Sequence, residues 1–542
     1  MKMTKKSLLL LAFALMLSLL LAACASEPDE GGDTGSDGGE DTENTEGDTT
    51  EAGGNDLIIA NLSDAVSLDP AGSNDTPSSD VQANIYETLV TQNQDMELQP
   101  GLAKEWELVE DNVWEFKLVE GIQFHDGTEF NAEAVKANIE RVIDPEVASP
   151  RAFLYEMVTE VEAVDEYTVR ITTEYPFSPL PSHLAHPGGG MVSPAVIEED
   201  YAAMEEGEEP GSYINENPIG TGYFKFESWE PGSEIVLVKN EDYWNGEAKL
   251  DSVTFRVVPE DQTRIAELLN GDVHISNPLS PSDVAQVENE DGVRVNRQGS
   301  VSTNYIGFNT QKEPFDDVRV RQAISMAIDK EQIIEGIFDG VGEPANGPLA
   351  PEVFGYNENL EPLEYDPERA QELLAEAGYE DGFSTTIWTN DKRERIDAAT
   401  NIQAQLSEIG VEVEVEQLEW GAYLEQTANG EHDMFVLGWT TVTGDADYGL
   451  YPLFHSSQQG DPGNRTFTDH EELDNLLEEA RREEDQAKRE ELYAEAQQFI
   501  VDDAPWIFLH HSEYLLGVRE EVKNLEQTPT QILKLKDVTI EQ

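Results

Sequence analysis

Residues 304–324 read NYIGFNTQKEPFDDVRVRQAI, and this stretch joins a strand pattern to a helix pattern. Its first part, Asn304–Phe308, is a short run rich in apolar and aromatic residues, as in a β-strand. Apolar residues then recur at helical spacing, which predicts a helix from about Asp317 to Ile337. A strand that leads into a helix in this way is typical of an α/β unit.

The same alternation continues on both sides of this stretch. Further strand patterns lie at residues 57–60, 235–238, 253–258 and, with strict alternation, 411–415. Asp366-Pro367 predicts the start of a helix that ends at Gly378. Residues 471–501 predict two charged helices with a break near residues 484–485. Because strands and helices alternate most regularly between residues 349 and 501, we expect an α/β fold.

The N-terminus has the pattern of an exported lipoprotein. Three lysines precede an apolar run from Leu8 to Ala23, which is shorter than a comfortable membrane span. The run ends in residues 21–24, LAAC, which resemble a lipobox, and Cys24 is the only cysteine of the chain. We expect residues 1–23 to be a lipoprotein signal peptide. Lipid on Cys24 would then hold the protein at the outer face of the cytoplasmic membrane, in an extracellular or periplasmic position. The alternative is an ordinary signal peptide with an incidental cysteine.

Acidic residues dominate the rest of the chain. Residues 24–56 contain acids and small polar residues with almost no apolar ones, which predicts a disordered tether and a fold that begins near Leu57. The whole chain has 112 Asp and Glu against 33 Lys and Arg, a net charge of −79 at pH 7. Nucleic acid needs a basic footprint, so this charge excludes nucleic acid as a partner. We interpret the acidic surface as an adaptation to a salty medium. The alternative is an acidic surface matched to a cationic ligand, which the spread of the acids along the whole chain opposes.

Sequence motifs of catalysis are missing. The chain has no phosphate-binding GxxxxGK, no HExxH and no GxSxG motif. Its close histidine pairs, His183 with His186 and His510 with His511, lack the partners and spacing of a zinc site. We therefore expect a binding protein without metal or cofactor, and not an enzyme.

Several stretches, in this order, resemble the peptide/nickel (family 5) extracellular solute-binding proteins of ABC importers. They are SLDP at 67–70, IYETLV at 85–90, WEFKL at 114–118, GIQFHDGT at 121–128, NPIGTGYFKF at 217–226, NEDYW at 240–244, FNT at 308–310 and PFDDVRVRQAI at 314–324. Together they cover nearly all of the chain from Leu57 onward.

The resemblance implies a bilobal clamp like the type II periplasmic binding proteins, with an extra small domain. Lobe I would consist of residues 57–92, 214–300 and 511–542, the inserted small domain of residues 93–213, and lobe II of residues 301–510. The ligand would lie between the lobes, which close about a hinge. Permease and ATPase subunits on other chains would recognise the closed form.

Within lobe II, the resemblance indicates two segments that contact the ligand. The first, IWTNDKRER at 387–395, contains Trp388 and a basic turn at a predicted strand-to-helix junction. Dipeptide binders of the family use an arginine in this region for the peptide carboxylate, and both Arg393 and Arg395 fit that role. The alternative is a solvated basic turn.

The second segment is GWTTVTGDADY at 438–448. Family members that bind free dipeptides or oligopeptides have an Asp three residues after this Trp, where it holds the ligand's ammonium group. Here that residue is Val442, and the following residues are closer to the glutathione-binding branch. We therefore expect ligand contacts from Trp439, Thr443, Gly444, Asp445, Asp447 and Tyr448. Alternatively, the two acids cap the next helix.

These expectations define a lipid-anchored substrate-binding protein of an ABC transporter that delivers short peptides or glutathione-like peptides to a permease. Whether the ligand is glutathione-like or a generic short peptide stays open. A nickel- or haem-binding protein of the same family is an alternative, although no His-rich patch favours it. A secreted envelope hydrolase is the alternative from a different class, and the missing nucleophile motifs oppose it.

Overall fold

A computed structural model describes residues 55–390, 392–460 and 463–541. The predicted signal peptide, Cys24 and nearly all of the predicted tether lie outside the described residues. The remaining chain, Gly53–Gln542, forms one compact unit. Its first strand begins at Asp56, next to the predicted start at Leu57. Among the described residues, every helix falls short of the length or the apolar character that a membrane span requires.

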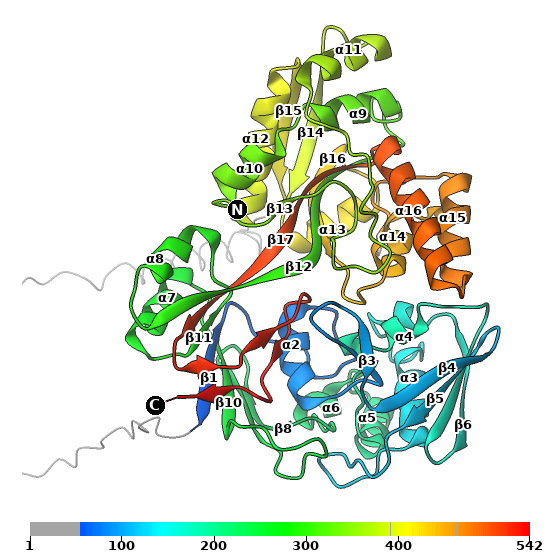
Figure 1. The fold of residues 1–542 in the computed structure, drawn as a ribbon, viewed down its shortest axis with the longest axis vertical. Helices are drawn as coiled ribbons and strands as arrows, with labels where there is room; N and C mark the ends of the chain where they lie inside the picture. The colour runs from blue at the N-terminus through cyan, green and yellow to red at the C-terminus, as the bar shows by residue number, and fades with distance from the viewer. Residues whose placement is uncertain (1–54, 391, 461–462, 542) are drawn as a thin grey trace, which may run out of the picture. The chain divides into compact units, whose positions relative to one another are not determined.

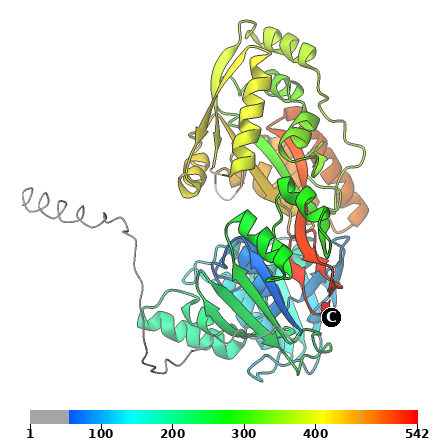
Figure 2. The same cartoon turned by 90° about the vertical axis from the view of Figure 1, so that its left-hand side faces the viewer.

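An eleven-stranded mixed sheet is the main element of this unit (Figure 1). Its order is β15-β14-β16-β12-β17-β11-β1-β10-β9-β8, and β13 pairs with β17 outside this path. Figure 2 shows one end of the sheet, where the green strands lie beside the blue β1. The strands are β15 (Val411–Gln417), β14 (Phe383–Thr389), β16 (Met434–Thr440), β12 (Val293–Phe308), β17 (Trp506–Arg519), β11 (Ile275–Asn277), β1 (Asp56–Asn61), β10 (Ser252–Val257), β9 (Glu234–Lys239), β8 (Phe224–Glu230) and β13 (Glu343–Pro344).

Two long antiparallel strands, β12 and β17, connect the two ends of this sheet (Figure 1). One half of β12 pairs with the C-terminal half of β17, from Val293 opposite Arg519 to Gly299 opposite Glu513. The register then shifts, and pairing resumes at Thr303 opposite His511. The other half of β12 also pairs with β16, so the two long strands lead from the sheet end around β1 to the end around β14.

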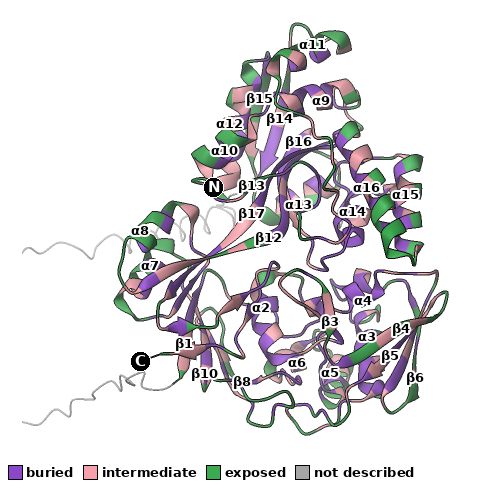
Figure 3. Cartoon of the chain, in the orientation of Figure 1, coloured by how far each residue is buried: buried purple, intermediate pink, exposed green. Residues whose placement is uncertain are grey.

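Helices cover the sheet end formed by β14, β15 and β16. They are α9 (Val318–Met326), α10 (Lys330–Ile337), α11 (Pro367–Ala377), α12 (Arg393–Ser407), α13 (Trp420–Ala428), α14 (Ala446–Phe454), α15 (Glu471–Arg482) and α16 (Gln486–Asp503). Near the other end lie α2 (Thr76–Ile85), α7 (Asp261–Asn270) and α8 (Val284–Glu288). In Figure 3, residues of β14 and β16 are buried, whereas α11 and α15 have exposed residues on their outer faces.

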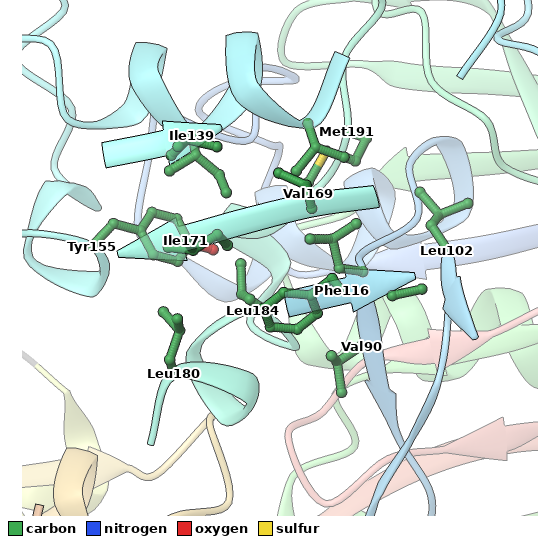
Figure 4. Packing of buried hydrophobic residues seen from close by; sticks show 14 of the residues in the cluster. Val90, Leu102, Phe116, Ile139, Tyr155, Val169, Ile171, Leu180, Leu184 and Met191 are labelled. Carbon is green, nitrogen blue, oxygen red and sulfur yellow. The ribbon is translucent and has the colours of Figure 1, made fainter. Parts of the chain in front are cut away.

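A separate four-stranded antiparallel sheet has the order β4-β5-β7-β6, with β4 (Ala103–Glu110), β5 (Val113–Leu118), β6 (Val158–Asp165) and β7 (Thr168–Thr173). Helices α3 (Ala132–Val142), α4 (Leu180–His183), α5 (Pro194–Glu206) and α6 (Ser212–Glu216) follow or interrupt its strands, and the hairpin β2 (Val90–Gln92) with β3 (Leu98–Pro100) precedes it. Side chains such as Phe116, Val169 and Leu184 form its apolar core (Figure 4). Tyr448 of α14 belongs to the same buried cluster, so the segment after β16 packs against this core.

The predicted α/β class and several local predictions are confirmed. Asp366 caps α11, and Gly378 ends it with a positive φ of 93°. The charged stretch forms α15 and α16, with the break at the predicted place. The single helix predicted from Asp317 to Ile337 is wrong, because the Asp329 side chain accepts a hydrogen bond from the backbone N–H of Gln332 and caps a separate helix, α10.

Candidate functional site

The turn after β16 determines where the predicted binding residues lie. Gly444 has φ +66° and donates its backbone N–H to the carbonyl of Thr441 over 2.8 Å. A Cβ atom at Gly444 would meet Gln92 Nε2 at 2.8 Å and Met96 Cε at 2.9 Å. Gln92 also donates a hydrogen bond to the carbonyl oxygen of the buried Thr443. A glycine at position 444 therefore lets this turn pack closely on the segment that includes β2.

Asp445 is the N-cap of α14. Its side chain accepts a hydrogen bond from the backbone N–H of Asp447 over 2.9 Å. The same carboxylate accepts a hydrogen bond from Arg489 Nη2 over 2.7 Å, and both side chains are buried. Burial lowers the pKa of Arg489, but the Asp445 carboxylate outweighs this effect, so the pKa is raised. The Asp445 carboxylate thus already has a cationic partner within the protein.

Asp447 forms a second buried ion pair, with Arg481. The two guanidinium nitrogens Nε and Nη2 donate to the two carboxylate oxygens over 3.1 Å each, a bidentate arrangement. The Arg481 guanidinium also lies over the Tyr451 ring, 3.6 Å from its centroid. The predicted ligand contacts Asp445 and Asp447 are therefore both paired with arginines of α15 and α16, and one of them also caps a helix.

Tyr448 and Trp439 form the aromatic part of the site. Their ring centroids are 5.2 Å apart, and the indole N–H of Trp439 donates to the backbone carbonyl of Tyr448 over 3.1 Å. The Tyr448 ring also contacts Phe153 and His186, at centroid distances of 5.9 and 6.1 Å. Burial raises the pKa of Tyr448 to about 12, so the phenol stays neutral at physiological pH. Burial also lowers the pKa of His186, which keeps its imidazole neutral.

A cavity of about 210 Å³ lies between this aromatic pair and the N-terminal part of α2. Its lining includes Trp439, Val442 and Tyr448 from the segment 439–448, Asp75 and Ser79 from the start of α2, and also His186. A ligand in this cavity would thus contact two segments that lie far apart in the sequence. Of the residues predicted to bind ligand, Trp439 and Tyr448 line this cavity.

A second cavity of about 380 Å³ adjoins the first, because Pro187, Val442, Thr530 and Ile532 line both. Its wall brings two of the sequence motifs together. Glu87, from IYETLV, accepts hydrogen bonds from Tyr243 Oη over 2.7 Å and Trp244 Nε1 over 2.9 Å, both from NEDYW. Burial raises the pKa of Glu87, and these hydrogen bonds oppose the rise.

The two arginines of the other predicted segment, 387–395, lie in different surroundings. Arg393 is 88% exposed and lies 3.6 Å from Asp397 in the next turn of α12. Arg395 lies over the Trp420 ring, 5.7 Å from its centroid, and donates to Asn390 Oδ1 over 3.3 Å. Burial lowers the pKa of Arg395. No carboxylate among the described residues lies within ion-pair distance of Arg395.

Trp388 is the residue before the last one of β14 and is buried. Its ring contacts His432 at a centroid distance of 6.2 Å, and its indole N–H has no hydrogen-bond partner among the described residues. Neither Trp388 nor the two arginines line the two cavities described above. The two predicted binding segments therefore differ, because residues of 438–448 line the cavities and those of 387–395 do not.

Sequence reasoning missed the cavity residues at the start of α2. Asn74-Asp75-Thr76-Pro77 has the pattern of a helix start, and Asp75 is the N-cap of α2. That pattern could have located the helix, but it does not say that the cap faces a cavity. Metal-binding clusters of three or more His, Cys, Asp or Glu are not found in the described part of the chain.

A family model and a curated protein are similar to this chain. The model of the bacterial extracellular solute-binding proteins, family 5 (middle region), matches residues 97–461. The glutathione-binding protein GsiB of Escherichia coli (strain K12) is 35% identical over 479 residues, which cover 85% of this chain and 91% of that protein.

Two solved structures of binding proteins are also similar to this chain. The ABC transporter-associated periplasmic binding protein DppA from Helicobacter pylori, in complex with the peptide STSA, is 33% identical, with a TM-score of 0.78 and coverage of 90% of this chain and 98% of that chain. The dipeptide-binding protein from Pseudoalteromonas sp. SM9913, in complex with Met-Leu, is 26% identical, with a TM-score of 0.78 and coverage of 90% and 100%. The predicted clamp-like α/β fold is thereby confirmed.

Proposed function

Since this chain belongs to family 5 of the bacterial extracellular solute-binding proteins, we propose that it captures a short or glutathione-like peptide for an ABC importer. The named ligands of its relatives support this proposal, because they include glutathione, the peptide STSA and the dipeptide Met-Leu. The departure at Val442 from the dipeptide-binding pattern favours a glutathione-like peptide, and a generic short peptide is the second candidate.

The cavity between Trp439 and Asp75 is the observation that carries this proposal. Its walls combine aromatic rings, which pack on apolar or planar parts of a ligand, with hydroxyl and carboxylate groups that fix orientation. The adjoining larger cavity gives room for a ligand that extends beyond the first one. Both cavities combine apolar and aromatic side chains with polar groups, as small-molecule sites do.

Of the two arginines in the basic turn, we propose that Arg395 rather than Arg393 would contact a ligand, and only a ligand that reaches beyond the two cavities, because neither arginine lines them. A half-buried guanidinium without a carboxylate partner among the described residues is well suited to a ligand carboxylate, especially in so acidic a protein. Arg393 points into solvent and lies beside Asp397. Trp388, near the end of strand β14, would support this turn.

For the turn after β16, we propose direct contacts from Trp439 and Tyr448 and an indirect role for the residues between them. Thr443 and Gly444 fit the turn against Gln92, and the ion pairs of Asp445 and Asp447 hold α14 in place. Loss of any of these would shift the aromatic wall of the cavity.

We further propose that lipid on Cys24 anchors the protein outside the cytoplasmic membrane, and that permease and ATPase subunits receive the ligand.

A thermal-shift screen tests the proposed ligand class. It uses the full chain carrying Cys24→Ser, with glutathione, dipeptides, oligopeptides and nickel as ligands. A ligand at 100 times its Kd stabilises the fold by about 2.7 kcal/mol, a clear rise in Tm. Stabilisation by nickel alone would favour the metal-carrier alternative.

A further inference from the structure

A peptide ligand with a free amino group needs an anionic acceptor, because a buried, unpaired ammonium group is strongly unfavourable. In the turn after β16, the position used by dipeptide binders holds Val442. The nearby carboxylates of Asp445 and Asp447 are paired with Arg489 and Arg481. Within the 210 Å³ cavity, the acceptor must therefore come from another residue.

Asp75 is the single carboxylate among the described residues that line the 210 Å³ cavity. One of its oxygens, Oδ1, accepts a hydrogen bond from the backbone N–H of Ser78 over 2.9 Å and caps α2. The other oxygen, Oδ2, is buried and has no hydrogen-bond partner among the described residues. A buried carboxylate oxygen without a donor is unfavourable unless a ligand supplies one.

The surroundings of Asp75 favour a cationic group at this oxygen. The aromatic rings of Trp439 and Tyr448 line the same cavity, and such rings attract a cation positioned over their faces. The cavity wall contains no lysine or arginine among its described residues, and the His186 imidazole is neutral because burial lowers its pKa.

One cation does lie nearby. Arg151 is fully buried and donates from Nη2 to Ser79 Oγ over 2.8 Å. Asp75 is among the groups that raise the pKa of Arg151, although burial dominates and lowers it to about 10. Arg151 does not line the cavity, and it forms no hydrogen bond or ion pair with Asp75 within the described part of the chain, so the second oxygen of Asp75 stays unpartnered.

We propose that the Asp75 carboxylate binds the ammonium group of the peptide ligand, with Oδ1 retained as the helix cap and Oδ2 facing the ligand. This assignment rests on the proposed function as a peptide-binding protein. It places the anionic contact at the N-cap of α2 and not in the turn after β16, where the dipeptide-binding relatives have theirs. Specificity for a free amino group then depends on a residue 364 positions before Trp439 in the chain.

The test uses Asp75→Asn, because Asn is as good an N-cap as Asp and removes only the charge. Asp366→Asn is the matched control, since Asp366 caps α11 in the same way and is exposed, away from the cavity. Each full-length variant also carries Cys24→Ser. Calorimetry compares two ligand pairs that differ only in the ammonium group. The pairs are glutathione with glutaryl-Cys-Gly, and trialanine with propionyl-Ala-Ala.

We expect the protein with Asp75 to bind at least one amino ligand roughly tenfold or more tightly than its partner without the amino group. Asp75→Asn should remove this preference by weakening the amino ligand alone, and Asp366→Asn should keep it. If Asp75→Asn keeps the full preference, or weakens both members of a pair equally, the assignment of Asp75 is wrong while the proposed function stands. If the protein with Asp75 binds none of the four ligands, the peptide-binding function and the Asp75 assignment both fall.

Discussion

The carboxylate of Asp445 lies 2.7 Å from Nη2 of Arg489, and this buried ion pair joins the first turn of α14 to α16. The same carboxylate caps α14. Because α14 follows directly on the turn that contains Val442 and carries the cavity residue Tyr448, the ion pair helps to determine the position of this part of the cavity lining. Asp445 therefore has a structural role. The sequence motif alone did not distinguish this role from contact with the ligand.

Asp445→Asn should therefore lower stability more than ligand affinity. Asn keeps the helix cap, but Arg489 becomes a buried cation without its partner, which costs about 3–5 kcal/mol. Urea unfolding measures this loss, and Asp366→Asn, an exposed cap, should change stability by less than about 0.5 kcal/mol. Replacing both members, as Asp445→Asn with Arg489→Met, should recover part of the loss. Unchanged stability together with a loss of affinity would instead favour direct contact between Asp445 and the ligand.

Asp80 should make stability depend on pH. Its Oδ1 accepts a hydrogen bond from the backbone N–H of Leu533 over 2.7 Å, and burial raises its pKa from 3.8 to about 7. In the unfolded chain Asp80 loses its proton near pH 4, whereas the folded protein holds it until about pH 7, so stability falls as the pH rises between these values. The full loss is about 4 kcal/mol above pH 7.

Asp80→Asn removes this titration and keeps an acceptor for Leu533. The variant should gain in Tm relative to the unsubstituted protein as the pH rises from about 4 to about 7, and the difference should then level off. Melting curves at several pH values measure it. A difference in Tm that does not change with pH would show that Asp80 does not titrate differently on folding.

Ionic strength should also affect stability. The chain has a net charge of −79 at pH 7, and like charges on one folded unit repel each other. Salt screens this repulsion, since the Debye length falls from about 30 Å at 0.01 M to about 3 Å at 1 M. We expect Tm to rise markedly over this range of NaCl concentration. A flat Tm would contradict the interpretation of the acidic surface as an adaptation to salt.

The proposed anchor makes a simple prediction about location. Cys24 is the only cysteine and follows the apolar run, so Cys24→Ser removes the one site for the lipid. The variant should move from the membrane fraction to the medium or the soluble envelope fraction. Retention in the membrane fraction after this substitution would exclude the lipoprotein hypothesis.

Local sequence patterns predicted much of the fold because their causes are local. Asp366, Pro367 and Gly378 act within one helix, and the alternation from Val411 onward reports one buried face of β15. The break at Asp329 was missed because apolar spacing alone continues through it, whereas a side-chain cap starts a new helix.

The candidate site was predicted only on one wall. Motif resemblance indicated Trp439 and Tyr448, which do line a cavity. The partners of Asp445 and Asp447 were not predicted, since Arg489 and Arg481 lie on helices whose packing no local pattern specifies. Asp75 was missed for the same reason, because only the tertiary fold brings the start of α2 and the turn after β16 to one cavity.

The central claim is that a peptide binds in the cavities between α2 and the turn after β16. Val442 lines both cavities, so Val442→Trp should fill them, whereas Val442→Ala should leave them open. The most direct measurement is a calorimetric titration of the full chain and these two variants, each with Cys24→Ser, against glutathione and trialanine. We expect one-to-one binding to the protein with Val442 and to Val442→Ala, and roughly a hundredfold or greater loss in Val442→Trp at an unchanged circular dichroism spectrum. Equal binding by Val442→Trp, or no binding by the protein with Val442, would contradict the claim.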